Sequence, residues 1–243
     1  MHRINFLNSV MDAATMDETV EIISRRVEHG IFTQHVVVNV AKLVNMRSDS
    51  NLRESVESCD IINIDGMGVV WGARFLGNIV PERVSGIDLF YRLVSLSEEK
   101  RFPIFLLGAT EDVVKETVHK IIARNPKVEV AGFHHGYFWD DEESVVQKIR
   151  SSGAKLLFVA ITSPKKENFI NRWKDQLGVN FVMGVGGTFD VVSGRVKRAP
   201  RLMQKWGLEW LYRVVQEPKR MWKRYLITNS KFALILLKAK LYK

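Results

Sequence analysis

The chain has 243 residues, of which 46% are hydrophobic, and it carries a formal net charge of +9. This length suits one large domain or a domain with an appendage, and the apolar content supports a buried core. The single cysteine, Cys59, excludes a disulfide framework and favours a packing role in a reducing compartment. Because neither a signal peptide nor a run of about 20 apolar residues is visible, we expect no membrane-spanning helix.

Positive charge is concentrated in the last part of the chain. Residues 195–243 hold 14 lysines and arginines against two glutamates, whereas residues 1–194 hold 22 basic and 25 acidic residues. A basic tail of this kind favours a polyanionic partner, which could be nucleic acid, anionic lipid or a diphosphate.

Helices and strands alternate along most of the chain. A capping box from Thr15 to Glu18 begins an amphipathic helix that Gly30 ends. Further helices are expected over 41–47, 52–58, 69–75, 86–96, 111–124 and 141–150 and from Pro164 onward. Short apolar runs predict strands over 35–39, 61–64, 103–107, 128–131, 155–161 and 180–185. This alternation predicts an α/β fold, with a Rossmann-like parallel sheet covered by helices on both faces.

After Pro200 the pattern becomes helical and rich in aromatic residues. We therefore divide the chain into a catalytic domain, 1–198, and a basic helical C-terminal appendage, 199–243. A helix that continues through this stretch would place Arg213, Arg220 and Arg224, spaced by seven and four residues, on one face, and Pro218 is a candidate kink in it. Basic residues interleaved with tryptophans are typical of a helix at a membrane interface. Packing of this helix on the body explains the pattern equally well, and the two roles are compatible.

Asp65 is the candidate catalytic residue. It follows the strand over 61–64 and precedes Gly66 and Gly68, where open α/β sheets place their ligands and where glycines let a substrate approach the backbone. A carboxylate in this position suits a general base. The competing interpretation, which the local sequence alone favours, is that Asp65 caps the helix that follows.

Several other strands also end in glycine or polar residues. Because these ends would line one rim of a parallel sheet, they predict a ligand crevice, in which a helix N-terminus can hold a phosphate. The segments are Asn39, Gly108-Ala109-Thr110, Ser163-Pro164-Lys165-Lys166-Glu167 and Gly186-Gly187. Neither a GxGxxG fingerprint nor a Walker motif is present. The adjacent His134 and His135 would face opposite sides of a strand, so the sequence predicts no metal site.

As a set, motifs between about residues 37 and 226 resemble the WecG/TagA/CpsF family of bacterial glycosyltransferases. The matching segments are Asp65-Gly66-x-Gly68-Val69-Val70, Glu82-Arg83-Val84-x-Gly86-x-Asp88, Leu106-Leu107-Gly108, His135-Gly136-Tyr137-Phe138, Ser163-Pro164-Lys165-x-Glu167, Gly184-Val185-Gly186-Gly187-x-Phe189-Asp190, Gly194 with Arg198-Ala199-Pro200, Gly207-Leu208-Glu209-Trp210-x-x-Arg213 and Gln216-Glu217-Pro218-x-Arg220. The resemblance implies an inverting transferase on the Rossmann-like fold called GT-E, with no metal or other cofactor. It also implies a UDP-sugar donor and a polyprenyl-diphosphate-linked sugar acceptor, used at the inner face of the cytoplasmic membrane to make surface polysaccharides.

The resemblance further assigns roles to single residues. Asp65 matches the family's proposed base, and Asn39 and Arg83 match substrate-contacting positions. The three tail arginines match an appendage that closes over the site and meets diphosphate and membrane, where cations would stabilise the leaving UDP. Further substrate contacts are expected from the rest of the rim, namely Gly108, Ala109, Lys165, Lys166, Glu167, Gly186, Gly187 and Asp190.

Two positions depart from the family pattern, and two other protein classes stay open. Lys166 stands where the family often has glutamine, and Val37 where it often has threonine, so the donor need not be an N-acetylmannosamine type. Lys166 would suit a donor with an extra negative charge, such as a uronic acid, but we favour a solvent-facing lysine.

The alternative functions for the whole chain are a nucleic-acid binder acting through the tail and a nucleotide-dependent oxidoreductase or epimerase. The donor sugar, the acceptor sugar, the pathway and a homo-oligomeric state are left open by the sequence.

Overall fold

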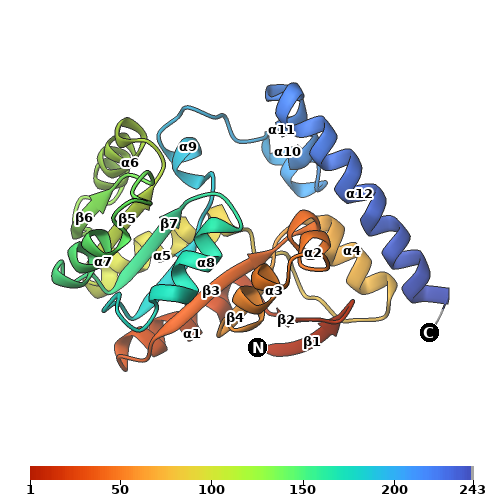
Figure 1. The fold of residues 1–243 in the computed structure, drawn as a ribbon, viewed down its shortest axis with the longest axis horizontal. Coiled ribbons are helices and arrows are strands. Elements are labelled where there is room, and N and C mark those ends of the chain that lie inside the picture. The colour runs from red at the N-terminus through yellow and green to blue at the C-terminus, as the bar shows by residue number, and fades with distance from the viewer. Residues whose placement is uncertain (242–243) are drawn as a thin grey trace.

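The computed structural model describes residues 1–241, apart from the side chain of Arg220. Its strands are β1 (His2–Phe6), β2 (Ser9–Ala13), β3 (Thr33–Val38), β4 (Ile61–Ile64), β5 (Ile104–Gly108), β6 (Val130–His134), β7 (Leu156–Ala160) and β8 (Phe181–Gly184). They form one sheet in the order β1-β2-β4-β3-β8-β7-β5-β6. The pair β1–β2 is antiparallel and every other pair is parallel. The expected parallel α/β sheet is therefore confirmed (Figure 1).

Twelve helices connect and cover these strands among the described residues. They are α1 (Met16–Glu28), α2 (Val40–Asn45), α3 (Ser50–Glu57), α4 (Met67–Phe75), α5 (Gly86–Lys100), α6 (Glu111–Arg124), α7 (Glu142–Ser151), α8 (Lys165–Trp173), α9 (Thr188–Val192), α10 (Arg201–Lys205), α11 (Glu209–Gln216) and α12 (Pro218–Leu241). The predicted capping box at Thr15 and the limits of α6 are confirmed.

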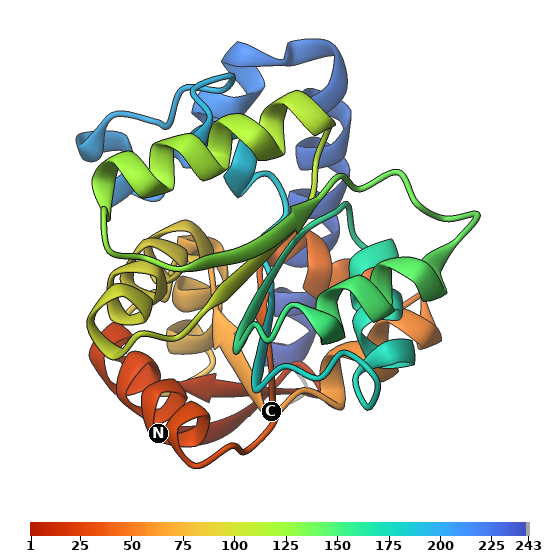
Figure 2. The ribbon, with the colours of Figure 1, turned by 90° about the vertical axis from the view of Figure 1, so that its left-hand side faces the viewer.

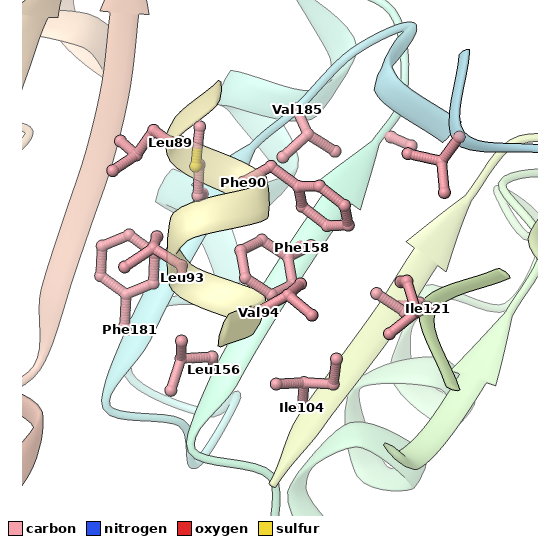
Figure 3. Packing of buried hydrophobic residues seen from close by; sticks show 14 of the residues in the cluster. Leu89, Phe90, Leu93, Val94, Ile104, Ile121, Leu156, Phe158, Phe181 and Val185 are labelled. Carbon is pink, nitrogen blue, oxygen red and sulfur yellow. The ribbon is translucent and has the colours of Figure 1, made fainter. Parts of the chain in front are cut away.

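Alternate residues of each central strand point to opposite faces of the sheet, as the geometry of a strand requires. Leu156 and Phe158 of β7 join a core cluster with α1, α5 and α6, whereas Leu157 and Val159 join a cluster with α7 and α8. Figure 3 shows Phe90 of α5 against Phe158, with the ring centroids 4.8 Å apart. Figure 2 shows the two helical layers on either side of the sheet. Both faces are thus buried, which explains why these strands read as continuous apolar runs.

The N-terminal hairpin was not predicted. β1 and β2 pair from His2 with Ala13 to Phe6 with Ser9, and the two-residue turn places Leu7 and Asn8 at φ of 54° and 63°. Such a turn favours Asn-Gly or Asp-Gly, and Leu-Asn gives little local signal for it. The hairpin adds β2 beside β4 and extends the sheet at one edge.

The C-terminal helices pack on the body and contribute to its core. α12 runs beside α2 and α4 toward the N-terminal hairpin (Figure 1). Phe232 is buried against Phe6, and a Cβ added at Gly72 would lie 2.9 Å from the Phe232 ring. The far half of α12 is therefore held in a fitted notch of the body. No helix within residues 1–241 is long and apolar enough to cross a membrane.

Candidate active site

Asp65 lies at the carboxyl end of β4, beside the end of β3. Its backbone N–H donates to the carbonyl of Val38 at 2.9 Å, which places it next to Asn39. The following helix, α4, has Gly66 at its N-cap and no side-chain cap, so the interpretation of Asp65 as the cap of that helix is wrong. Instead, Asp65 Oδ2 accepts a hydrogen bond of 3.2 Å from the backbone N–H of Gly86, the first residue of α5. Asp65 thus joins two helix starts at the rim.

The surroundings of Asp65 favour its protonated form more than water does. The side chain is partly buried, and this loss of solvent raises the pKa of the Asp65 carboxyl above its usual range. Arg83, the Gly86 N–H and Arg213 act in the opposite direction on this pKa, and Glu209 adds to the rise. A carboxylate with a raised pKa is a stronger base than an exposed one, and perturbed carboxyls in such positions are typical of catalytic groups.

Arg83 is held by a residue of the appendage. Its Nη1 lies 2.5 Å from Oε2 of Glu209, the first residue of α11. Arg198 extends the same network, since its two terminal nitrogens donate to Asp88 at 2.6 and 2.7 Å and its Nε lies 3.7 Å from Glu209 Oε1. Two arginines therefore face one glutamate, which ties α11 to the body beside Asp65.

Asn39 lies at the end of β3 and caps α2, because its Oδ1 accepts from the N–H of Lys42 at 3.0 Å. Lys42 in turn reaches Glu167, with 2.8 Å between Nζ and Oε1, and Lys166 makes the same contact at 2.8 Å. All three side chains are buried. We refer to them as the buried triad, and it joins the helix that Asn39 begins to α8.

The buried position of Lys166 corrects the expectation that this lysine faces solvent. Its residue is only 7% exposed, and its stem lies against Gly184, where an added Cβ would be 2.7 Å from Lys166 Cε. Burial and the nearby Lys42 lower the pKa of Lys166 to about 8, whereas the two lysines lower the pKa of Glu167 to about 2. Two ammonium groups against one carboxylate leave an excess of positive charge inside the protein when both lysines are protonated.

The remaining rim residues lie along the ends of β5, β7 and β8. Gly108 has a φ of 130° and lies so close to β7 that an added Cβ would meet the Ala160 carbonyl at 2.4 Å. Ala109 follows at a φ of 56°, and its carbonyl accepts from the Gly136 N–H at 2.8 Å. This tight turn brings backbone to the rim, as a substrate crevice requires. Gly186 and Gly187 follow β8, Asp190 lies in α9, and Lys165 is exposed with its Nζ 4.8 Å from the centroid of the Trp139 ring.

The structure brings some of the predicted site residues together and separates others. Asn39, Asp65 and Arg83 lie close together under α11, and the exposed Arg213 is near enough to act on the pKa of Asp65. The helix is interrupted at Glu217, with Arg213 in α11 and Arg224 in α12, so the expectation of one face on a continuous helix is wrong. The exposed Arg224 acts on Lys166 instead, and the side chain of Arg220 lies outside the described residues. An open cavity of about 750 Å³ at the end of β6, lined by Gly132, His134 and His135 among others, contains none of the predicted site residues.

A profile of the "Glycosyl transferase WecG/TagA/CpsF family" matches residues 4–243. The chain belongs to this family. A relative from Bacillus subtilis (strain 168) is 37% identical over 190 residues, which cover 78% of this chain and 73% of the relative. One from Bacillus spizizenii (strain ATCC 23059 / NRRL B-14472 / W23) is 36% identical over 183 residues, 75% of this chain and 70% of the relative. Both are named N-acetylglucosaminyldiphosphoundecaprenol N-acetyl-beta-D-mannosaminyltransferase.

Membership confirms the resemblance and makes this protein a glycosyltransferase. The two alternative classes, a nucleic-acid binder and an oxidoreductase or epimerase, are no longer needed to explain the sequence. Among the described residues, no group of three or more His, Cys, Asp or Glu side chains is arranged to hold a metal ion.

Sequence reasoning gave no role to Glu209, Lys42, Asp88 or Arg198. A signal existed for Glu209, because it is one of only two acids among the many bases of residues 195–243. Lys166 and Glu167 were predicted at the rim from the segment after β7, but their pairing with Lys42 had no local signal, since Lys42 is distant from them in the sequence.

Proposed function

We propose that this glycosyltransferase moves a sugar, with inversion at the anomeric carbon, from a UDP-sugar to a polyprenyl-diphosphate-linked sugar. The acceptor class is supported by the names of the two Bacillus relatives. The single observation that carries the mechanism is Asp65, a partly buried carboxylate of raised pKa at the strand end, next to the Arg83–Glu209 pair.

Asp65 acts as the general base in this proposal. Its carboxylate takes the proton from the acceptor hydroxyl while that oxygen forms the new bond to the anomeric carbon. The bond between the anomeric carbon and the UDP oxygen breaks on the opposite face, and UDP leaves with the electron pair. General-base help of this kind contributes about 10²–10⁴-fold to the rate.

Cationic side chains balance the charge that develops on the leaving UDP. Arg83 and Arg213 are close enough to Asp65 to lower its pKa. A guanidinium group can donate two parallel hydrogen bonds to the oxygens of a diphosphate. We assign the same role to Arg220 and Arg224 and propose that the reaction needs no metal. The donor lies along the rim of Gly108, Ala109, Lys165, Gly186, Gly187 and Asp190, and Asn39 contacts the sugar.

The burial of Lys166 bears on which donor sugar the site would accept. Lys166 is buried and paired with Glu167, so we assign Lys166 and Glu167 to the wall behind the sugar site. Val37 is half-buried, with its Cγ2 3.4 Å from where a Cβ at Gly86 would lie, and we assign it to the sugar site. An N-acetylmannosamine donor, as in the names of the relatives, is the first candidate, and the corresponding uronic acid is the second.

The appendage places the enzyme on the inner face of the cytoplasmic membrane. α12 carries seven lysines and arginines and no acid, and its exposed side chains include Trp222 and Leu226. Such a helix binds anionic lipid through both charge and apolar area.

Transfer from a panel of UDP-sugars to a synthetic prenyl-diphosphate-linked N-acetylglucosamine, with and without EDTA, tests this proposal. We expect one donor to be used, with equal product in both conditions. Dependence on a divalent metal would contradict the arginine-based mechanism. Absence of transfer from every donor, together with no binding of UDP, would contradict the proposed reaction.

A further inference from the structure

A stripe of exposed apolar side chains runs along α4, on the catalytic body. Trp71 and Phe75 are spaced by four residues and share one face of the helix, and we call them, together with Ile79, the α4 stripe. Trp71 is 52% exposed and Phe75 is 49% exposed, and Ile79, just beyond the helix, is 83% exposed. Large apolar groups left in water in a row mark an interaction surface more often than scattered ones do.

The loop that carries Ile79 is fixed to the end of α4. The guanidinium of Arg74 donates to the carbonyls of Val80 and Pro81 at 2.7 and 3.2 Å. Ile79 therefore lies in a loop whose backbone is fixed to the end of α4.

The appendage continues this apolar surface. Lys240 of α12 lies over the Phe75 ring, with 5.2 Å from Nζ to the ring centroid, so this side of α12 borders the α4 stripe. Trp222, Leu226 and Leu237 precede Lys240 by 18, 14 and 3 residues, spacings that return to the same side of a helix. All three are exposed.

The two helices that carry this surface hold charges of one sign. Neither α4 nor α12 contains an aspartate or glutamate, and Arg74, Lys223 and Lys240 border the apolar side chains. Lysines that keep their ammonium groups near water while their stems cover apolar surface are suited to a layer of anionic headgroups. Tryptophan prefers the same interfacial depth.

We propose that the α4 stripe of Trp71, Phe75 and Ile79 enters the headgroup layer of an anionic bilayer together with α12. The body, and not only the appendage, then touches the membrane. This inference rests on the proposed membrane association of the appendage and deepens it. Because α4 begins next to Asp65, two contacts on one side of the molecule fix the catalytic rim at a defined height and angle to the lipid surface.

Single-cysteine probes on the full-length protein test this orientation. Cys59 is buried and its pKa is raised to about 12, so a thiol-reactive dye will label an introduced exposed cysteine instead. We would attach the environment-sensitive dye NBD to Ile79→Cys, to Leu237→Cys on α12 and to the matched control Ile122→Cys. Ile122 is an exposed residue of α6, away from this surface. Vesicles of phosphatidylcholine with and without phosphatidylglycerol are then added, and binding is measured by co-sedimentation.

We expect the probes at positions 79 and 237 to shift to the blue and brighten several-fold on anionic vesicles, while the probe at position 122 stays unchanged. Co-sedimentation with a response at 237 but none at 79 would overturn the inference and leave the appendage as the membrane contact. Absence of co-sedimentation would overturn both. As a second readout, Trp71→Ser with Phe75→Ser should weaken vesicle binding about tenfold, whereas Ile122→Ser should not, because apolar area that leaves the interface lowers affinity.

Discussion

Arg83 and Glu209 meet at 2.5 Å, with one side chain from the loop before α5 and the other from the first turn of α11. This pair joins the catalytic body to the appendage directly beside Asp65. It also sets two opposite charges against one titrating carboxyl, because Arg83 lowers the pKa of Asp65 and Glu209 raises it. The contact that holds the appendage against the body therefore also affects the pKa of Asp65.

Glu209→Gln removes the negative charge that raises the pKa of Asp65. The pKa of Asp65 should fall, so the acid limb of the kcat/KM pH profile, where activity is lost by protonation of the base, should move to lower pH. Transfer rates measured between pH 4 and 9 check this. Arg83→Gln is the matched control, because loss of that positive charge should move the same limb to higher pH. Shifts in the same direction for both variants would contradict the electrostatic role of the pair.

Glu167→Gln leaves Lys42 and Lys166 buried without a counter-charge. Breaking a buried ion pair by removing one partner costs about 3–5 kcal/mol, so the free energy of unfolding should fall by that order. Lys166→Gln instead leaves a one-to-one pair of Lys42 and Glu167, and its effect should be small or stabilising. Urea unfolding at pH 7 measures both. Equal losses would show that the triad does not act as a charge cluster.

The buried triad also predicts a pH dependence of stability. The pKa of Lys166 is lowered to about 8 in the folded state, so above about pH 8 the unfolded chain holds more protons at this site than the folded chain does. The contribution of Lys166 to stability should therefore rise between pH 8 and 10. Comparison of the wild type with Lys166→Gln isolates it. A difference between the two proteins that stays constant over this range would contradict the lowered pKa.

Phe232 anchors α12 in the notch above Gly72. Phe232→Ala should lower the free energy of unfolding by about 3–5 kcal/mol, as large-to-small changes of buried aromatics do. Leu234→Ala, at an exposed position two residues away, is the control and should change little.

Truncation after residue 200 should leave a folded but less stable body with weak membrane binding and little transfer. Full activity of the truncated protein would contradict the role of the appendage.

The sheet was predictable because its strands carry strong local patterns. The apolar runs that became β5, β7 and β8 are buried on both faces, and this produces a signal that does not depend on distant residues. The hairpin of β1 and β2 lacked such a signal, since its turn uses Leu7 and Asn8 at positive φ.

The site was predictable only where a strand end gives a local motif. Asn39 and Asp65 could be placed at one rim because parallel strands end together. The ion pairs beside these two residues join segments that are far apart in the sequence. Glu209 pairs with Arg83 near Asp65, and Glu167 pairs with Lys42 in the helix that Asn39 caps. The burial of Lys166 follows from tertiary packing against Gly184, which no periodicity in the sequence reveals.

The central claim is that Asp65 removes the proton from the acceptor hydroxyl. Asp65→Asn keeps an oxygen that can accept from the Gly86 N–H, so the fold and the binding of UDP should be retained. The measurement is sugar transfer to the prenyl-diphosphate-linked acceptor, with UDP affinity measured by calorimetry on the same sample. The account predicts UDP binding within about threefold of the wild type and transfer reduced by about 10²–10⁴-fold. Transfer at the wild-type rate, with UDP bound equally well, would contradict it.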